Sequence, residues 1–285
     1  MAVSLEKESL MPTRTAILSD IHGNSPALRA VLADVRQMEC ARIYLLGDVI
    51  NGYDPHGCLD LLRSLPNLAC LKGNAEFYLL TPDLEALPPD TDPDIYNVVR
   101  LVQWFRAHLT AEDLAWLQSW PDRLYWERAI LVHDSPLDRL FPQDHYLPGV
   151  PQKYQEFLFH ARGFVPDTPA AEWQLLLDWM EAQHIAHVYC AHTHVPFCRS
   201  FGDRLVCNSG SVGLPLDGDP RGSWLLVEES PAQAAAVTIR RVPYDLDQIL
   251  ALVDRTPDYP DADLPNRKRA YKLMLQTGTH WRTHI

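Results

Sequence analysis

The sequence lacks any apolar stretch long enough to cross a membrane. Its 285 residues contain no window approaching the roughly 18 uninterrupted apolar residues that a bilayer span requires. The opening segment, MAVSLEKESLMPTR, carries acidic residues and has no apolar core of a secretion signal. We therefore expect no association with membranes, and the cytoplasm is the default location.

Basic residues are scarce as well. The 25 lysines and arginines are outnumbered by 37 aspartates and glutamates, which gives a formal net charge of −12. Binding to nucleic-acid backbones depends on clustered lysine and arginine, so general nucleic-acid binding is not expected. An anionic ligand would need a local positive charge, such as that of a bound metal ion.

The chain has six cysteines but no CxxC pair. Several of them lie inside apolar patterns, which is typical of reduced, buried thiols. A zinc site formed by Cys190, His192, His194 and Cys198 is an alternative, but Cys190 lies back along the predicted strand, towards the core. The sequence also lacks a Gly-x-Ser-x-Gly elbow and a P-loop, which disfavours serine hydrolases and P-loop nucleotidases.

The first third of the chain contains a regular alternation of apolar strands and helices. Strands are predicted at 13–19, 41–48 and 68–74, with helices at 26–38 and 57–65 between them. Ser25, followed by Pro26, is expected to cap the first of these helices. Such alternation predicts a parallel sheet, in which ligands bind beyond the carboxyl ends of the strands.

From about residue 76 to 127 the pattern becomes helical, and we interpret this region as an insertion that could cover a site. The stretches 96–109 and 110–120 are predicted to be helices, the second with a capping box formed by Thr110 and Asp113. Aromatic residues on these helices follow one helix face, so we interpret them as packing residues: Trp104, Phe105, Trp116 and Trp120.

The second half is predicted to be mostly antiparallel or mixed sheet. A strand at 128–134 and a helix at 169–183 precede further strands at 187–194, 204–211, 222–229 and 235–244. We divide the chain into an N-terminal extension at 1–12, one domain at 13–255 and a C-terminal tail at 256–285. The tail, with a weak final helix, is expected to wrap on the surface or to be partly loose.

Seven side chains that can bind a metal lie where predicted strands end. They are Asp20, His22, Asp48, Asn74, His133, His192 and His194. Residues two apart on a strand point to the same face, so Asp20 with His22, and His192 with His194, can each converge on one centre. Oxygen and imidazole ligands suit divalent ions, and two ions about 3.5–4 Å apart can hold a phosphate group. One histidine alone would be interpreted as structural, whereas the ordered set predicts a two-metal hydrolase.

The ordered motifs SDIHGN, GDV, KGN, VHD, AHTH and NSGSVGLP resemble the calcineurin-like metallophosphoesterase superfamily over about residues 13–245. The resemblance is closest to its small prokaryotic branch of phosphodiesterase and diadenosine-tetraphosphatase-like proteins. It implies an α/β fold, namely a four-layer αββα sandwich of two mixed sheets with flanking helices.

The resemblance also implies a dinuclear centre at the strand ends. One ion would be held by Asp20, His22, Asp48 and His194, and the other by Asp48, Asn74, His133 and His192. Asp48 would bridge two divalent or trivalent ions of manganese, iron, zinc, nickel or cobalt. Asp48 and Asn74 would thereby serve catalysis, in which metal-bound hydroxide attacks phosphorus directly.

Departures from the family pattern bear on the substrate. Protein phosphatases of the superfamily have a histidine general acid where this chain has Ala75, and two arginines where it has Gly52 and Lys72. A leaving group that is already a stable anion needs little help from an acid. We therefore expect a small phosphorylated substrate, such as a nucleotide, with a phosphodiester or phosphoanhydride bond, and not phosphoserine or phosphothreonine.

Several further residues are candidate substrate contacts: Asn51, His56, Lys72 and Asn208. His56 is a candidate replacement for the missing acid, although an ordinary place at a helix entry also explains it. The amides of Gly210 to Gly213 could form a phosphate nest, but we favour a structural turn there, with Asn208 and Ser209 as possible contacts. Arg221 is expected to pair with Asp217 or Asp219.

Two alternative functions remain open at the level of sequence. The first is a phosphomonoesterase or protein serine/threonine phosphatase. The second is a non-catalytic interaction module, like the retromer subunit that shares the fold. Such a module is expected to have lost ligands, whereas all seven are present in this chain.

Overall fold

The computed structural model of the chain describes residues 13–80, 104–137, 163–230, 233–256 and 267–280. Within these residues the strands form two five-stranded sheets. The first sheet contains β10 (Gln233–Val242), β9 (Gly222–Ser230), β1 (Thr13–Leu18), β2 (Arg42–Leu45) and β3 (Leu68–Cys70), in that order. The second contains β4 (Arg123–Trp126), β5 (Ala129–Val132), β6 (His187–Cys190), β8 (Arg204–Asn208) and β7 (Phe197–Phe201).

The first sheet confirms the parallel arrangement predicted for the first third of the chain. β1 pairs in parallel with β2, and β2 pairs in parallel with β3. The last two strands, β9 and β10, also belong to this sheet, because β9 pairs antiparallel with β1. The first sheet is therefore assembled from both ends of the chain.

The second sheet is mixed, as predicted for this half. β5, β6 and β8 run parallel, whereas the edge strands β4 and β7 are antiparallel to their neighbours. Neither edge strand was predicted from the sequence. β7 exposes Cys198, Arg199 and Ser200 in succession, so it has no apolar run.

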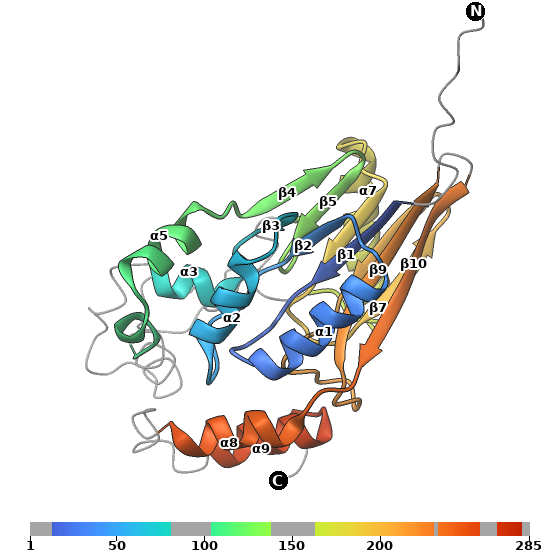
Figure 1. Cartoon of the computed structure of the whole chain (residues 1–285). Helices are drawn as coiled ribbons and strands as arrows, with labels where there is room; N and C mark the ends of the chain where they lie inside the picture. The colour runs from blue at the N-terminus through green and yellow to red at the C-terminus, as the bar shows by residue number, and fades with distance from the viewer. Residues whose placement is uncertain (1–12, 81–103, 138–162, 231–232, 257–266, 281–285) are drawn as a thin grey trace, which may run out of the picture.

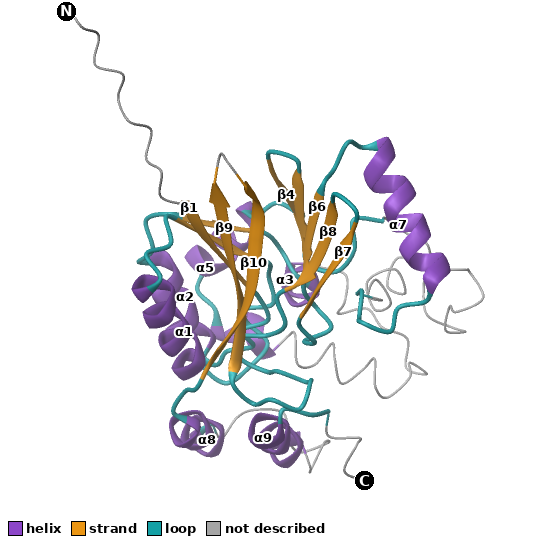
Figure 2. Ribbon diagram, turned by 90° about the vertical axis from the view of Figure 1, so that its right-hand side faces the viewer, coloured by secondary structure: helices purple, strands orange, loops and turns teal. Residues whose placement is uncertain are grey.

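Three hydrophobic cores lie between four layers of helices and sheets. The first core lies between the first sheet and α1 (Ser25–Gln37), α2 (Pro55–Arg63) and neighbouring helices. The second lies between the two sheets, where Ile17 of β1 and Tyr189 of β6 are both fully buried. The third packs the second sheet against α7 (Ala170–Ala182). Figure 2 shows helices on both outer sides of the paired sheets, which is the predicted αββα sandwich.

The N-terminal cap of α1 differs from the prediction. Asn24, and not Ser25, is the cap residue, and its side chain accepts a hydrogen bond from the amide of Ala27. Ser25 lies inside the helix, and its hydroxyl donates to the Asp54 carboxylate, which caps α2. The Ser25–Pro26 pair predicts a cap at Ser25, but proline is tolerated throughout the first turn, so its position does not fix the cap residue.

The middle of the chain is helical where it is described. α3 (Asn74–Leu80) and α5 (Ala111–Ser119) are joined to the first core, and the predicted capping box of Thr110 and Asp113 is present. Phe105 and Trp120 are buried in that core, which confirms the packing role of the aromatic residues. The other part of the predicted insertion, residues 81–103, lies outside the described residues.

The C-terminal segment forms two helices, α8 (Leu246–Arg255) and α9 (Arg267–Thr277). They lie side by side at one end of the sandwich (Figures 1 and 2). Tyr271 and Leu275 of α9 are buried in the first core. The predicted final helix is thus packed against the domain and contributes to its core.

The structure bears on the predicted burial of the cysteines and on the expected lack of a membrane-spanning helix. Cys58, Cys70, Cys190 and Cys207 are buried as predicted, whereas Cys40 is half-buried and Cys198 is exposed. Cys198 differs because it lies on the edge strand β7. Among the helices that the structure describes, none combines the length and the apolar character needed to cross a bilayer.

Candidate metal centre

The seven predicted ligands lie just beyond the ends of strands from both sheets. Asp20 and His22 follow β1, Asp48 follows β2, and Asn74 begins α3 shortly after β3. His133 directly follows β5, and His192 and His194 come after β6. Because four ligands come from the first sheet and three from the second, the site lies where the ends of the two sheets meet.

Backbone hydrogen bonds fasten the two loops of the first sheet together. The amide of Asp20 donates to Gly47 O (3.1 Å), and the amide of His22 donates to Asp48 O (3.0 Å). The amide of Gly23 then donates to Val49 O at 2.8 Å. This short ladder continues the β1–β2 pairing beyond the strands, so Asp20, His22 and Asp48 are placed by the backbone as well as by their side chains.

Left-handed backbone conformations are concentrated in the ligand loops. Eight non-glycine residues of the described chain have positive φ, and five of them are predicted ligands. These five are Asp20 (51°), His22 (48°), Asp48 (55°), His192 (68°) and His194 (59°). Such conformations are costly for residues with a side chain and persist where the surrounding structure enforces them, often at functional sites.

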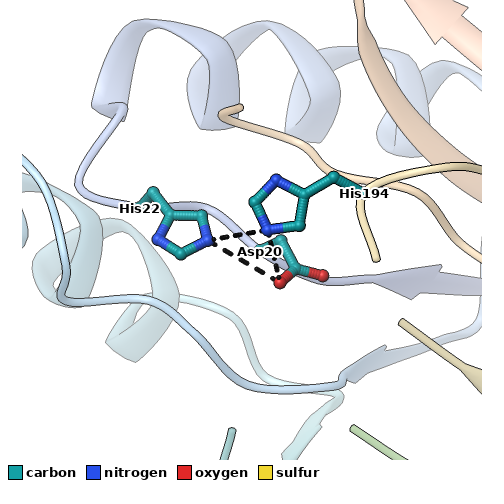
Figure 3. A group of neighbouring side chains, drawn as sticks. All are labelled: Asp20, His22 and His194. Carbon is teal, nitrogen blue, oxygen red and sulfur yellow. Dashed lines mark hydrogen bonds and ion pairs between the residues drawn. The ribbon is translucent and has the colours of Figure 1, made fainter. Parts of the chain in front are cut away.

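Asp20, His22 and His194, the first cluster, point their ligand atoms towards one another (Figure 3). Asp20 Oδ1 is 3.2 Å from His194 Nε2 and 3.7 Å from His22 Nε2, and the two Nε2 atoms are 3.1 Å apart. Asp20 Oδ1 is buried and has no hydrogen-bond partner in the described part of the chain. A buried carboxylate oxygen without a donor, facing two imidazole nitrogens, fits a bound cation.

Asp48, His133 and His192, the second cluster, lie beside Asn74. The amide oxygen Oδ1 of Asn74 is 3.0 Å from His133 Nε2 and 2.8 Å from His192 Nδ1. The two imidazole nitrogens are 3.1 Å apart, and His133 Nε2 is 3.6 Å from Asp48 Oδ1. Two nitrogens, a carboxylate oxygen and an amide oxygen therefore converge, a donor set that suits a divalent transition-metal ion.

The Asp48 carboxylate faces both clusters. Its Oδ1 is directed to His133, while its Oδ2 is 3.8 Å from His22 Nε2 of the first cluster. The amide of Ala75 donates to Oδ1 at 2.8 Å and fixes the orientation of the carboxylate. The side chain is almost completely buried. Of the seven side chains, Asp48 is thus suited to bridge two ions.

Two backbone carbonyls orient histidines towards the site. Nδ1–H of His194 donates to Leu214 O at 2.5 Å, and Nδ1–H of His133 donates to Leu46 O at 2.6 Å. These hydrogen bonds place the proton on Nδ1 and leave the Nε2 lone pair of each ring directed into its cluster. The sequence could not identify these acceptors, because any residue type supplies a carbonyl.

Glu76 is a site residue that the sequence analysis missed. Its buried carboxylate accepts hydrogen bonds from the amides of Asp48 (2.8 Å), Val49 (2.9 Å) and Gly73 (2.8 Å). It therefore ties the loop of Asp48 to the loop of Asn74. Burial and the nearby Asp48 raise the pKa of Glu76, although the three amide hydrogen bonds counteract them. Its position two residues after Asn74 was the available signal.

Burial and neighbouring charges set opposite protonation preferences within the site. Burial raises the pKa of Asp20, but His194 and His22 outweigh it and hold this pKa well below its usual range. Burial lowers the pKa of His133, yet Asp48 and Asp20 raise it to about 9. Burial and the charge of His133 lower the pKa of His192 to about 4. The carboxylates of the pocket therefore favour bound positive charge, which protons or metal ions can supply.

The glycine-rich loop after β8 joins the ligand loops. The side-chain amide of Asn208 donates to Ala191 O (2.7 Å) and Thr193 Oγ1 (3.1 Å), on either side of His192. Ser211 Oγ donates to Asp20 O at 2.6 Å, and the amide of Gly213 donates to the same oxygen at 3.0 Å. These contacts support the structural interpretation of this loop. Arg221 pairs with Asp219, as predicted.

The other candidate substrate contacts are less directly connected to the ligands. The ammonium of Lys72 donates to Trp120 O and lies 3.5 Å from Asp122 Oδ1. His56 contacts His108 O, and its Nδ1 is 3.6 Å from Asp113 Oδ2. Asn51 lies half-buried in the loop between β2 and α2. Any role of these residues in binding substrate stays a prediction.

Gly52 shows why the loop after Asp48 departs from the protein-phosphatase pattern. A Cβ atom at this position would lie 1.6 Å from His22 O, inside the backbone of the first ligand loop. No side chain, and therefore no arginine, fits there without moving that loop. The missing phosphate clamp is thus a consequence of how closely the two loops approach.

Comparison with known proteins confirms the family resemblance. The family model described as calcineurin-like phosphoesterase matches residues 13–196. An uncharacterized protein of Methanocaldococcus jannaschii, MJ0912, is 26% identical over 264 residues, which cover 88% of this chain and 96% of that protein. Phosphodiesterase YfcE of Escherichia coli K12 is 26% identical over 209 residues, covering 73% of this chain and 84% of YfcE.

A crystal structure of a metallophosphoesterase from Sphaerobacter thermophilus resembles the fold with a TM-score of 0.65. Its sequence is 26% identical, and the match covers 94% of this chain and 100% of that chain. The similarity therefore extends past the ligand loops to the C-terminal part of the molecule.

Proposed function

Because the chain belongs to the calcineurin-like phosphoesterase family, we propose that it is a dinuclear-metal-dependent phosphoesterase that hydrolyses phosphodiester or phosphoanhydride bonds. The observation that carries the proposal is the position of Asp48, whose two carboxylate oxygens face different groups of imidazole nitrogens. A carboxylate so placed can hold two cations close together.

The ligands divide into two sets. Asp20, His22, His194 and one oxygen of Asp48 would hold the first ion, and His133, His192, Asn74 and the other oxygen of Asp48 would hold the second. When bound, two such ions supply a water of lowered pKa and positive charge for the phosphoryl oxygens. The chain itself contributes the fixed orientation of these side chains, through Leu214 O, Leu46 O and the Ala75 amide.

The absence of a histidine at position 75 favours substrates with good leaving groups. Ala75 offers only its backbone amide, which is already donated to Asp48. With no acid beside Asn74, an alkoxide leaving group such as that of serine would depart unprotonated. A nucleotide or phenolate leaves as a stable anion, and the name of the relative YfcE, a phosphodiesterase, agrees with this preference. A small phosphorylated substrate, such as a nucleotide derivative, follows from the same reasoning.

Steady-state rates of the full chain loaded with Mn²⁺ test the proposal. We expect turnover of bis-p-nitrophenyl phosphate or diadenosine tetraphosphate to exceed that of a phosphoserine peptide by at least about 100-fold, the smallest usual contribution of a general acid. Metal analysis should find two ions per chain. The control is the same protein after chelation, which should be inactive and should recover when Mn²⁺ is restored.

Two results would contradict the proposal. Faster hydrolysis of the phosphoserine peptide would assign the chain to the phosphomonoesterases. Two ions per chain without turnover of any phosphate ester would instead favour a non-catalytic interaction module.

A further inference from the structure

The C-terminal helix α9 reaches the first cluster through one hydroxyl group. Tyr271 Oη donates a hydrogen bond to the backbone carbonyl of His22 at 3.0 Å, across 249 positions of sequence. Tyr271 is only 8% exposed, and Leu275, one turn further along α9, is fully buried. Figure 1 shows α9, in red, beside α8 at the end of the sandwich, far in sequence from the loop that it contacts.

The carbonyl of His22 lies in a crowded place. The neighbouring groups of this loop form backbone hydrogen bonds to the Asp48 loop, from the His22 amide to Asp48 O and from the Asp54 amide to Gly23 O. The His22 carbonyl takes no part in that ladder, and Gly52 approaches it so closely that a Cβ would overlap it. His22 also has a left-handed backbone, with φ of 48°. The Tyr271 hydroxyl therefore satisfies a buried acceptor on a strained ligand residue.

The phenol itself is held in position by the loop of the second ligand motif. The ring of Tyr271 lies 4.9 Å from the ring of Tyr53, measured between centroids. Tyr53 directly follows Gly52 and is buried. This aromatic pair restricts the Tyr271 side chain and sets the direction of its hydroxyl before metal binds. The hydrogen bond to His22 therefore costs little additional side-chain entropy.

The residue Gly278, just after α9, also contacts the loop that orients His194, the other histidine of the first cluster. The amide of Gly218 donates to Gly278 O, just beyond α9, at 2.7 Å. The same loop carries Leu214, whose carbonyl accepts from His194 Nδ1, and Leu216, whose amide donates to His194 O at 3.3 Å. Both histidines of the first cluster thus depend on segments that α9 contacts.

We propose that Tyr271 is a positioning residue of the metal centre, which sets the affinity of the first cluster for its ion and leaves the second cluster unaffected. The inference rests on the proposed function, because it presumes that the two clusters hold metal. It extends the centre to α9, which lies beyond the residues 13–196 that match the family model. The hydrogen bond of Tyr271 goes to the backbone of His22, which is a ligand of the first cluster and not of the second.

Calorimetric titration with Mn²⁺ tests the proposal in two variants of the full chain, each of which keeps only one of the two metal sites. His192→Ala should leave only the first cluster able to bind, and His194→Ala only the second. Adding Tyr271→Phe, which removes the hydroxyl and keeps the ring, should weaken binding about 10-fold or more in the His192→Ala background, the usual effect of losing an outer partner of a metal ligand. In the His194→Ala background the affinity should not change.

Tyr189→Phe is the matched control. Tyr189 is fully buried between the sheets, and its hydroxyl has no hydrogen-bond partner among the residues that the structure describes. Removing this hydroxyl should leave Mn²⁺ affinity unchanged in both backgrounds. Thermal unfolding of the metal-free proteins provides a second readout, because a purely structural role for Tyr271 would lower Tm without separating the two sites.

Equal Mn²⁺ affinity with and without Tyr271→Phe in the His192→Ala background would overturn the inference. Equal weakening in both backgrounds would overturn it too, since it would show a general structural effect. Absence of any binding by the wild-type chain would instead refute the proposed metal centre, and the inference with it. The two failures are therefore distinguishable.

Discussion

The two clusters differ in how closely the protein surrounds them. All three residues of the first cluster are buried, whereas His192 of the second cluster is half-buried. The first cluster contains a carboxylate of its own, Asp20, and the second has the neutral Asn74 beside the shared Asp48. An ion at the first cluster would thus be better enclosed and more fully neutralised. We infer that the first cluster retains its ion and that the second is the side from which phosphate approaches.

Charge supports the same distinction. An ion in contact with one shared carboxylate and a neutral amide keeps more of its positive charge than an ion that faces two carboxylates. An ion held by the second cluster would therefore be the stronger electrophile for a phosphoryl oxygen. The greater exposure and charge of the second cluster would favour substrate binding, while the burial of the first cluster would favour retention of its ion.

Removing the shared carboxylate should break both clusters, and this is the largest effect that we expect. Asp48→Asn keeps the shape of the side chain but removes the charge that both ions would share. Loss of several kcal/mol of charge stabilisation corresponds to roughly 1000-fold or more in kcat/KM. Steady-state kinetics on bis-p-nitrophenyl phosphate and metal analysis of the purified variant provide the measurement.

Asp34→Asn is the control for this substitution. Asp34 pairs with Arg240 and accepts from Trp224 on the outer face of the first sheet. Its loss should lower stability slightly and leave kcat/KM within about twofold of wild type, because exposed and half-exposed ion pairs contribute little. If Asp48→Asn retained two ions and wild-type activity, the assignment of a shared ligand would be wrong.

Adding a single methyl group at Gly52 should break the first cluster and spare the second. The Cβ of Gly52→Ala would overlap His22 O, which displaces the backbone that carries Asp20 and His22. We expect a loss of about 3 kcal/mol or more in the free energy of unfolding, at the upper end of single-substitution effects. Mn²⁺ binding should fall to one ion per chain.

Gly202→Ala separates crowding from backbone conformation. A Cβ at Gly202 would meet nothing within 4 Å, although φ is +64° there. The left-handed conformation alone should cost about 1 kcal/mol, with both ions retained. Denaturant unfolding and metal analysis of the two variants give the comparison. Equal destabilisation by both substitutions would show that the close approach of Gly52 to His22 is unimportant.

Changing the pH should have the smallest of the three effects. It should act through His133 of the second cluster. The pKa of His133 is raised from 6.5 to about 9. A raised pKa in the folded state adds stability that is complete below pH 6.5 and is lost as the pH rises through 9. The metal-free protein should therefore lose stability across this range, as measured by urea unfolding of chelated protein.

Metal binding should show the opposite slope. A ligating imidazole must be neutral, so His133 has to release a proton, and Mn²⁺ affinity should rise up to about tenfold per pH unit between 6.5 and 9. Calorimetry in buffers of different ionisation enthalpy would detect the released proton. His133→Gln should flatten the stability slope, whereas His187→Gln, at the half-buried start of β6 and outside the metal centre, should not. Stability independent of pH in the wild-type chain would contradict the prediction.

The sequence was informative where a local pattern decides the structure. Each apolar run of the parallel strands ends in a polar ligand, so β1, β2 and β3 and the residues Asp20, Asp48 and Asn74 could be predicted together. The edge strands β4 and β7 of the second sheet were missed because they span only four or five positions and each has a single buried residue, so neither contains an apolar run. The place of β9 and β10 in the first sheet could not be predicted, since strand pairing depends on distant partners.

The supports of the site were harder to predict than its ligands. Leu46 and Leu214 act through backbone carbonyls, which carry no signature in the sequence. Tyr271 acts from a helix near the C-terminus, and only the folded chain brings it to His22. Glu76 was within reach of sequence reasoning, but its importance comes from three amides whose directions the loops determine.

The location of the seven ligands at the junction of the sheets has a mechanical consequence. Ions at this position would link residues 20–74 of the first sheet to residues 133–194 of the second, in addition to the apolar core between the sheets and the hydrogen bonds beside the site, such as that from His133 to Leu46 O. The complete sites would form only after the two sheets have packed together, so metal binding would indicate completed folding. Bound ions would also add stability that increases with the free-ion concentration. Starving a cell of the ion would then loosen the sandwich itself, and enzyme abundance would track metal supply.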